Sequence, residues 1–319
     1  MSNPYHVPAG RQRLSPQIYR RRRIVAFAAL VLVAIGTYRL ASAILVDSDA
    51  TEAAKPVPST NLVVSDGSTP VTAASTPTSP ASTTTAPPKE PFVPTAATPA
   101  TLLIVGDSEA GTFGPYLETL MNQTGVVTTK LDYKVSSGLS RPDFFDWPAH
   151  FNDTLPAINP DIVVATFGGN DAQGLSELGG NFIEQQPTGE TGGDVDWRAE
   201  YGRRVGAAMD QLGAGNRTLI WVGIPNDDSA EVTARMRVQD EVVRAEAAKR
   251  PDVVFIDTWA RFSGISGGWA QFVIDPRDGV GKDVRADDGF HLNTTGAEIL
   301  ALDIAEAIRT DLRARGATF

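Results

Sequence analysis

The chain has 319 residues, no cysteine and a formal net charge of −10 at neutral pH. Its length would allow two domains, but its composition is so uneven that we expect a single folded domain, beginning near residue 100. Without cysteine, disulfides and thiolate chemistry are excluded. The acidic balance argues against nucleic acid as a partner, because phosphate binding needs a basic surface.

The first 46 residues contain seven arginines and no acidic residue, and the first carboxylates, Asp47 and Asp49, follow directly. Residues 24–46 form an apolar run of 23 residues, enough to cross about 30 Å of hydrocarbon at about 1.5 Å per residue. We predict a cytoplasmic basic tail over residues 1–23 and a single transmembrane signal anchor over residues 24–46. The remaining chain is then extracytoplasmic. A cleavable signal peptide with a cleavage site at Ala41–Ala43 is the alternative, and it exports the same part.

Residues 47–100 are rich in serine, threonine, proline and alanine and contain few large apolar side chains. Such a segment buries too little surface to offset the entropy of ordering, so it predicts a disordered linker. Beyond the arginines of the first 46 residues, 21 basic residues remain against 38 acidic ones, a balance of −17 for the exported part. We expect this part to fold over residues 101–319.

The sequence over residues 101–319 alternates apolar strand patterns with helical patterns. This alternation indicates an α/β fold whose parallel sheet is covered on both faces. Thr295 and Glu298 have the spacing of a capping box at the start of the last helix. Residues 267–289 are rich in glycine and aspartate and predict a long excursion with at most a hairpin. The predicted strands are Thr101–Val105, Lys130–Val135, Asp161–Phe167, Thr218–Ile224 and Asp252–Thr258, and the clearest helices are Arg198–Leu212, Ala230–Arg250 and Thr295–Arg313.

The first strand ends in Gly106–Ser108, at the edge where open α/β sheets place their chemistry. Ser108 is therefore either a nucleophile or a helix cap. A serine nucleophile needs a nearby base, and only His150 and His291 lie outside the cytoplasmic tail. Asp288 stands three residues before His291, close enough to fix its tautomer, and Asp287 competes with it for that role.

Four motifs accompany these residues in order along the chain. They read GDS at Gly106–Ser108, SSGLSRPDFFDWP at Ser136–Pro148, GGND at Gly168–Asp171 and DDGFH at Asp287–His291. Together they resemble the SGNH hydrolase superfamily, also called GDSL esterases, over Leu102–Arg313. The second block is most similar to a membrane-anchored branch that consists of domains of unknown function. This resemblance implies a three-layer, flavodoxin-like fold with a mainly parallel five-stranded sheet.

The resemblance also implies the roles of individual residues. Ser108 would be the nucleophile, His291 the general base and Asp288 its orienting carboxylate. The backbone N–H groups of Ser108 and Gly138 and the side-chain amide of Asn170 would form the oxyanion hole. No cofactor and no metal are expected. The aspartates between residues 275 and 288 do not have the spacing of an EF-hand calcium loop.

One residue departs from the resemblance, since the fourth position of the GDSL motif is Glu109 instead of leucine. A carboxylate there would be stabilised by the helix dipole in the first turn, or it could shape the mouth of the substrate site. Asp107 and Asp171 are expected to hold loops through backbone hydrogen bonds. Trp147 is as consistent with a core position as with the cleft. The candidates for lining a substrate cleft are Glu109, Trp147, Asp171 and Asn226.

These observations predict an exported, membrane-tethered serine esterase that hydrolyses O-acyl esters on a cell-envelope glycan or lipid. An alternative with the same triad is an envelope O-acyltransferase, which would need a soluble donor or a membrane acyl-donor partner. A second alternative is a non-catalytic envelope-binding module. It predicts a lost triad member, and none is missing here.

Overall fold

The computed structural model describes residues 90–319. The predicted basic tail and transmembrane anchor, with residues 47–89 of the predicted linker, lie outside the described residues. None of the helices in the described part combines the length and the apolar content that crossing a bilayer requires. The first strand begins at Ala100, next to the predicted start of the folded domain.

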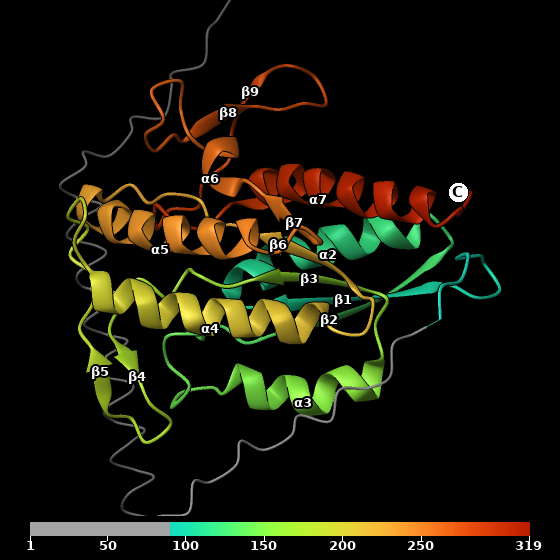
Figure 1. Cartoon of the computed structure of the whole chain (residues 1–319). Coiled ribbons are helices and arrows are strands. Elements are labelled where there is room, and N and C mark those ends of the chain that lie inside the picture. The colour runs from blue at the N-terminus through green and yellow to red at the C-terminus, as the bar shows by residue number, and fades with distance from the viewer. Residues whose placement is uncertain (1–89) are drawn as a thin grey trace, which may run out of the picture. The chain divides into compact units, whose positions relative to one another are not determined.

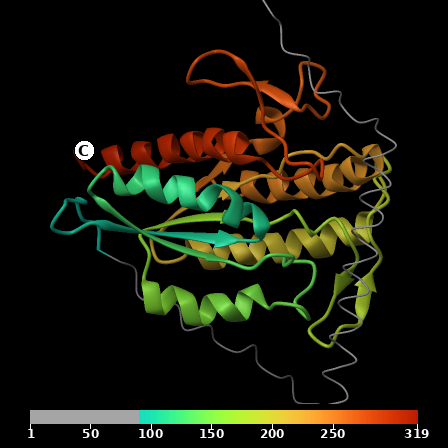
Figure 2. The ribbon, with the colours of Figure 1, turned by 180° about the vertical axis from the view of Figure 1, so that it is seen from behind.

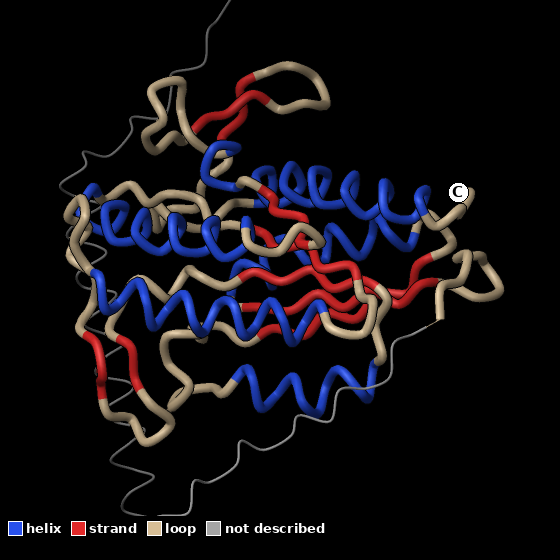
Figure 3. The backbone as a smooth tube through the Cα atoms, viewed as in Figure 1, coloured by secondary structure: helices blue, strands red, loops and turns tan. Residues whose placement is uncertain are grey.

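A five-stranded sheet forms the centre of the fold, in the order β2-β1-β3-β6-β7, and every neighbouring pair is parallel (Figures 1 and 3). Strands β1 (Ala100–Gly106) and β3 (Ile162–Thr166) consist of buried residues along their whole length, apart from a half-buried Thr101. Such burial is expected for a sheet covered on both faces. This arrangement confirms the predicted α/β fold with a mainly parallel five-stranded sheet. The strands are β1 (Ala100–Gly106), β2 (Val127–Tyr133), β3 (Ile162–Thr166), β6 (Thr218–Val222) and β7 (Val253–Ile256).

Two helical layers cover the sheet, because successive side chains of a strand point to opposite faces. Leu102 and Ile104 of β1 belong to the core under helices α2 (Ser108–Asn122) and α7 (Thr294–Ala314). Leu103 belongs to the core on the other face. Figures 1 and 2 show these layers from the front and from behind. The helices of the second layer are α3 (Trp147–Ile158), α4 (Val195–Gly213) and α5 (Ala230–Ala248).

Two hairpins and a short helix interrupt this alternation. Within residues 267–289 the strands β8 (Phe272–Ile274) and β9 (Gly281–Asp283) pair antiparallel, which confirms the predicted hairpin. A second hairpin, β4 (Leu175–Ser176) with β5 (Phe182–Glu184), was not expected from the sequence because its strands are so short. The short helix is α6 (Thr258–Arg261).

The start of α7 differs from the predicted capping box. The cap is Asn293, in extended conformation, and its side-chain oxygen accepts a hydrogen bond from the N–H of Gly296 at 3.1 Å. Its amide nitrogen also donates to the backbone oxygen of Asp283 at 3.0 Å, so the residue ties the helix to β9. The expectation that Thr295 caps the helix is wrong because Thr295 already lies inside the first turn.

Replacing Asn293 by alanine should lower the free energy of unfolding by about 1 kcal/mol, since one first-turn N–H loses its acceptor. Thr295→Ala is the matched control and should change it by less than about 0.5 kcal/mol. Urea unfolding of both variants measures the difference. A larger loss for Thr295→Ala would show that the cap has been assigned to the wrong residue.

Candidate active site

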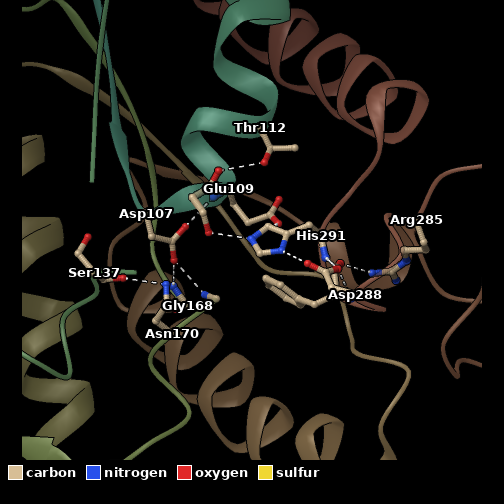
Figure 4. Close-up of polar contacts among 12 residues, drawn as sticks. Asp107, Glu109, Thr112, Ser137, Gly168, Asn170, Arg285, Asp288 and His291 are labelled. Carbon is tan, nitrogen blue, oxygen red and sulfur yellow. Dashed lines mark hydrogen bonds and ion pairs between the residues drawn. The ribbon is translucent and has the colours of Figure 1, made fainter. Parts of the chain in front are cut away.

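The four sequence motifs meet at the carboxyl edge of the sheet. Ser108 begins α2 directly after β1, and Gly138 follows β2 in the next loop. Asn170 follows β3, and His291 lies in the segment that leads into α7. Parallel strands all end at this edge, so residues that are distant in sequence come together there. Figure 4 shows the resulting cluster.

A continuous chain of hydrogen bonds links the serine to a carboxylate. Ser108 Oγ lies 2.8 Å from His291 Nε2, and His291 Nδ1 lies 2.6 Å from Asp288 Oδ2. An ionised carboxylate only accepts hydrogen bonds, so Nδ1 carries the proton and Nε2 accepts from the serine hydroxyl. Of the two candidate histidines, His291 is therefore the one within hydrogen-bonding distance of Ser108, and its ring is bonded to Asp288.

Asp288 is held as an anion by the loop around it. Its Oδ1 accepts the backbone N–H groups of Phe290 and His291 at 3.1 and 3.0 Å. Partial burial acts to raise the pKa of Asp288, but the hydrogen bonds from the imidazole and from these two N–H groups outweigh it and lower the pKa below its usual value. The carboxylate therefore remains charged at neutral pH and fixes the orientation of the ring.

Asp107 connects the serine to the neighbouring strand. It caps α2 by accepting the N–H of Glu109 at 2.9 Å, and its other oxygen accepts the N–H groups of Gly168 and Gly169 at 3.0 and 2.9 Å. The pKa of Asp107 is raised to about 6. Burial is the main cause and the negative charge of Asp171 adds to it, while the backbone donors act in the opposite direction. The expected loop-holding role of Asp107 is confirmed.

Asp171 organises the loop that carries Gly138. Its carboxylate accepts the N–H groups of Leu139 and Ser140 at 3.0 and 2.9 Å and the hydroxyl of Tyr201 at 2.8 Å. A Cβ atom on Gly138 would lie only 1.9 Å from Asp171 Oδ1, so only glycine fits beside this carboxylate. The expected loop-holding role of Asp171 is also confirmed, and the close approach explains the glycine.

The remaining oxyanion candidate, Asn170, lies against the same loop. Its side-chain nitrogen donates to the backbone oxygen of Ser137 at 3.1 Å, which uses one of its two N–H bonds. The indole nitrogen of Trp147 donates to the hydroxyl of Ser137 at 3.0 Å from beneath. The loop that follows β2 is thus held by two side chains, an amide from the segment after β3 and an indole from α3.

The four side chains expected to line a substrate cleft are all buried. Trp147 belongs to the core under α3 and α4, which confirms the core alternative. Asn226 is enclosed, and its side chain accepts a hydrogen bond from Arg285 and donates one to Ser263. Trp147, Asp171 and Asn226 are held by packing or by hydrogen bonds beneath the surface, and the cleft role of these three residues and of Glu109 stays a prediction. The exposed fractions are 2% for Glu109, 1% for Trp147 and 0% for Asp171 and Asn226.

Arg285 was missed by the sequence analysis. It is 4% exposed, and its guanidinium donates to the backbone oxygens of Asn226, Phe262 and Phe290 at 2.9 to 3.0 Å. Its pKa is lowered to about 10, because burial outweighs the opposite effect of nearby carboxylates, Glu109 first among them. The guanidinium therefore stays a cation at neutral pH. Because Phe290 precedes His291, Arg285 positions the base through the backbone. Its partners lie up to 59 residues away, and no local pattern signals them.

Within residues 90–319, no group of three or more histidine or acidic side chains is arranged to hold a metal ion. The acidic residues of the β8–β9 hairpin have other partners. Asp275 pairs with Arg277 at 2.7 Å, and Asp278 pairs with Lys282 at 2.8 Å. These two carboxylates are therefore used in ion pairs along the hairpin itself.

A comparison with known families matches residues 101–307 to the family described as "Protein of unknown function (DUF459)". The chain belongs to the DUF459 family. The predicted assignment to a branch of domains of unknown function is confirmed, and all four motifs lie inside the matched segment. No curated protein matches the chain significantly.

Solved structures similar to this DUF459 chain include two from bacteria. One is a GDSL-like lipase from Bacteroides thetaiotaomicron, at 14% identity and a TM-score of 0.45, covering 66% of this chain and 89% of that one. The other is an acetylxylan esterase from Geobacillus stearothermophilus, at 16% identity and a TM-score of 0.46, covering 66% of this chain and 94% of that one.

Replacing Arg285 by methionine should lower the free energy of unfolding by at least about 3 kcal/mol, because three buried carbonyls lose a donor at about 1–3 kcal/mol each. Arg203→Met is the matched control. The Arg203 side chain is 68% exposed and, among residues 90–319, pairs only with Glu200, so its loss should cost less than about 1 kcal/mol. Urea unfolding of the DUF459 protein measures both, and equal losses would contradict the positioning role.

Proposed function

We propose that this protein is a serine ester hydrolase. The observation that carries the proposal is the hydrogen-bonded chain from Ser108 through His291 to Asp288 at the carboxyl edge of the sheet. A serine hydroxyl is a weak nucleophile unless a base removes its proton during attack, and this arrangement supplies that base. The hydrogen bonds that hold Asp288 and the first turn of α2 favour one geometry of the three side chains.

In the first half of the reaction, Ser108 Oγ attacks the ester carbonyl while its proton passes to His291 Nε2. The negative charge that develops on the carbonyl oxygen needs donors already in place. The first-turn N–H of Ser108 has no intrahelical acceptor, and Asn170 keeps one side-chain N–H beyond its bond to Ser137. Together with the N–H of Gly138, these groups form the proposed oxyanion hole.

Collapse of the tetrahedral intermediate breaks the ester bond and yields the acyl-serine. The proton on His291 Nε2 passes to the departing alcohol, so the imidazole is neutral again. A water molecule then donates a proton to the same nitrogen and attacks the acyl carbonyl. The bond between the acyl carbon and Ser108 Oγ breaks, the carboxylic acid leaves, and the proton on Nε2 restores the Ser108 hydroxyl. Asp288 stabilises the imidazolium in both halves and stays ionised throughout.

The proposed substrate is an O-acyl ester on a cell-envelope glycan or lipid. Support comes from the sequence before the folded domain, in which an arginine-rich tail precedes a 23-residue apolar run and a serine- and threonine-rich segment. Such an order is typical of a domain tethered outside the cytoplasmic membrane. A tethered hydrolase reaches substrates within the length of its linker, so the envelope is the natural source of its esters.

Hydrolysis of p-nitrophenyl acetate by the full-length chain should require both Ser108 and His291. We expect Ser108→Ala and His291→Ala each to lower kcat/KM by at least about 10³-fold, because members of such a triad act as a unit. The measurement is release of p-nitrophenol under matched conditions, with circular dichroism to verify folding.

The matched control is His150→Ala. His150 also pairs with a carboxylate, Asp132 at 2.7 Å, but it lies in α3 and makes no hydrogen bond to the Ser108 chain. Its loss should change kcat/KM by less than about threefold. Activity that survives Ser108→Ala, or a folded wild type without turnover on esters of any acyl length, would contradict the proposed function.

The proposed location is tested separately. In cells, the full-length chain should sediment with membranes, and added protease should remove its C-terminal domain from spheroplasts without lysis. A cytoplasmic marker protein is the control for intact membranes. Protection of the domain until the cells are lysed would overturn the extracytoplasmic location and leave the hydrolase proposal standing.

A further inference from the structure

Glu109 follows the proposed nucleophile, and its side-chain carboxyl makes no hydrogen bond within residues 90–319. It lies in the first turn of α2, as the helix-dipole expectation requires, but it is 2% exposed instead of facing water. Neither of its carboxyl oxygens forms a hydrogen bond with any residue of the described chain. Buried polar groups almost always have a partner, so an orphaned carboxyl at a catalytic centre calls for a functional explanation.

The nearest basic group is the catalytic histidine. Glu109 Oε1 lies 4.0 Å from His291 Nε2, the same nitrogen that contacts Ser108 Oγ. Figure 4 shows the Glu109 carboxyl beside the imidazole ring, on the other side of which Asp288 holds Nδ1. The ring is therefore flanked by two carboxyl groups, one bonded to it and one in close approach.

The surroundings of Glu109 favour its protonated form. Its pKa is raised to about 8, first of all by burial and also by repulsion from Asp107 and Asp288, while the positive charge of Arg285 acts in the opposite direction. His291 also faces it and, as a cation, would favour the carboxylate. Below about pH 8, the pair formed by Glu109 and His291 therefore holds at least one proton.

The position of that proton decides whether Ser108 has a base. With the proton on Glu109, Nε2 of His291 is free to accept the serine hydroxyl. With the proton on Nε2, the carboxylate and the imidazolium attract each other at 4.0 Å, and the serine has lost its acceptor. Interacting groups of this kind release their protons as a pair.

We propose that Glu109 and His291 share one proton in the resting site, so that the site gains a free base at a higher pH than His291 and Asp288 alone would provide. This inference rests on the proposed function for its effect on catalysis. Glu109 is then a positioning residue for a proton and does not touch the substrate. Leucine, the residue that the GDSL resemblance leads one to expect here, could not hold the proton.

The kinetic test compares the pH dependence of kcat/KM for the full-length wild type, Glu109→Gln and Glu109→Leu on p-nitrophenyl acetate between pH 5 and 9. When the shared proton lies on His291, the Glu109 carboxylate stabilises the imidazolium, so removing the carboxyl should move the rise in activity to lower pH. We expect a shift of at least about one pH unit in both variants. Asp132→Asn, which removes the carboxylate beside His150, is the matched control and should leave the profile in place.

A second measurement does not depend on turnover. The chain has three histidines, so NMR of histidine-labelled protein can follow each imidazole through its titration. In Glu109→Gln the midpoint for His291 should fall by at least about one pH unit, while those of His6 and His150 stay where they are. An unchanged His291 midpoint in a folded variant would overturn the shared proton. A wild type without esterase activity but with this shift would overturn the proposed function and leave the shared proton supported.

Discussion

The buried carboxylate of Asp107 is the interaction on which the active edge depends. It caps the helix that begins with Ser108, and it also binds the two glycine N–H groups that follow β3. One side chain therefore fixes both the direction of the nucleophile and the approach of the loop that carries Asn170. A buried carboxylate is costly unless donors surround it, so the geometry of both loops is constrained by the same group.

The other loops of the proposed active site are held in a similar way. Asp171 binds the N–H groups after Gly138, and Arg285 binds carbonyls on three segments, including the one before His291. In each case an enclosed charge is satisfied mostly by backbone groups. Loops without regular structure thereby acquire one conformation, because any other would leave the charge unpaired.

Glu109 contrasts with these three residues. It is as enclosed as they are, yet its carboxyl oxygens have no donor within the described chain, and burial raises its pKa so that it can hold a proton beside His291. A group in that state adds little to positioning the backbone. It adds a second ionisation beside His291, which links the availability of the base to pH.

The sequence by itself determined the α/β class, the strands and the order of the motifs, because these depend on local periodicity and on turns at strand ends. Ser108, Asp288 and His291 were identified through a resemblance carried by such local motifs. Only the tertiary structure decided that Asn293 caps α7, that Trp147 and Asn226 are enclosed, and that Arg285 supports the catalytic loop. The partners of Arg285 come from segments up to 59 residues apart in the chain. Burial and long-range hydrogen bonds arise only when such segments pack, so no local pattern could reveal the environment of Glu109.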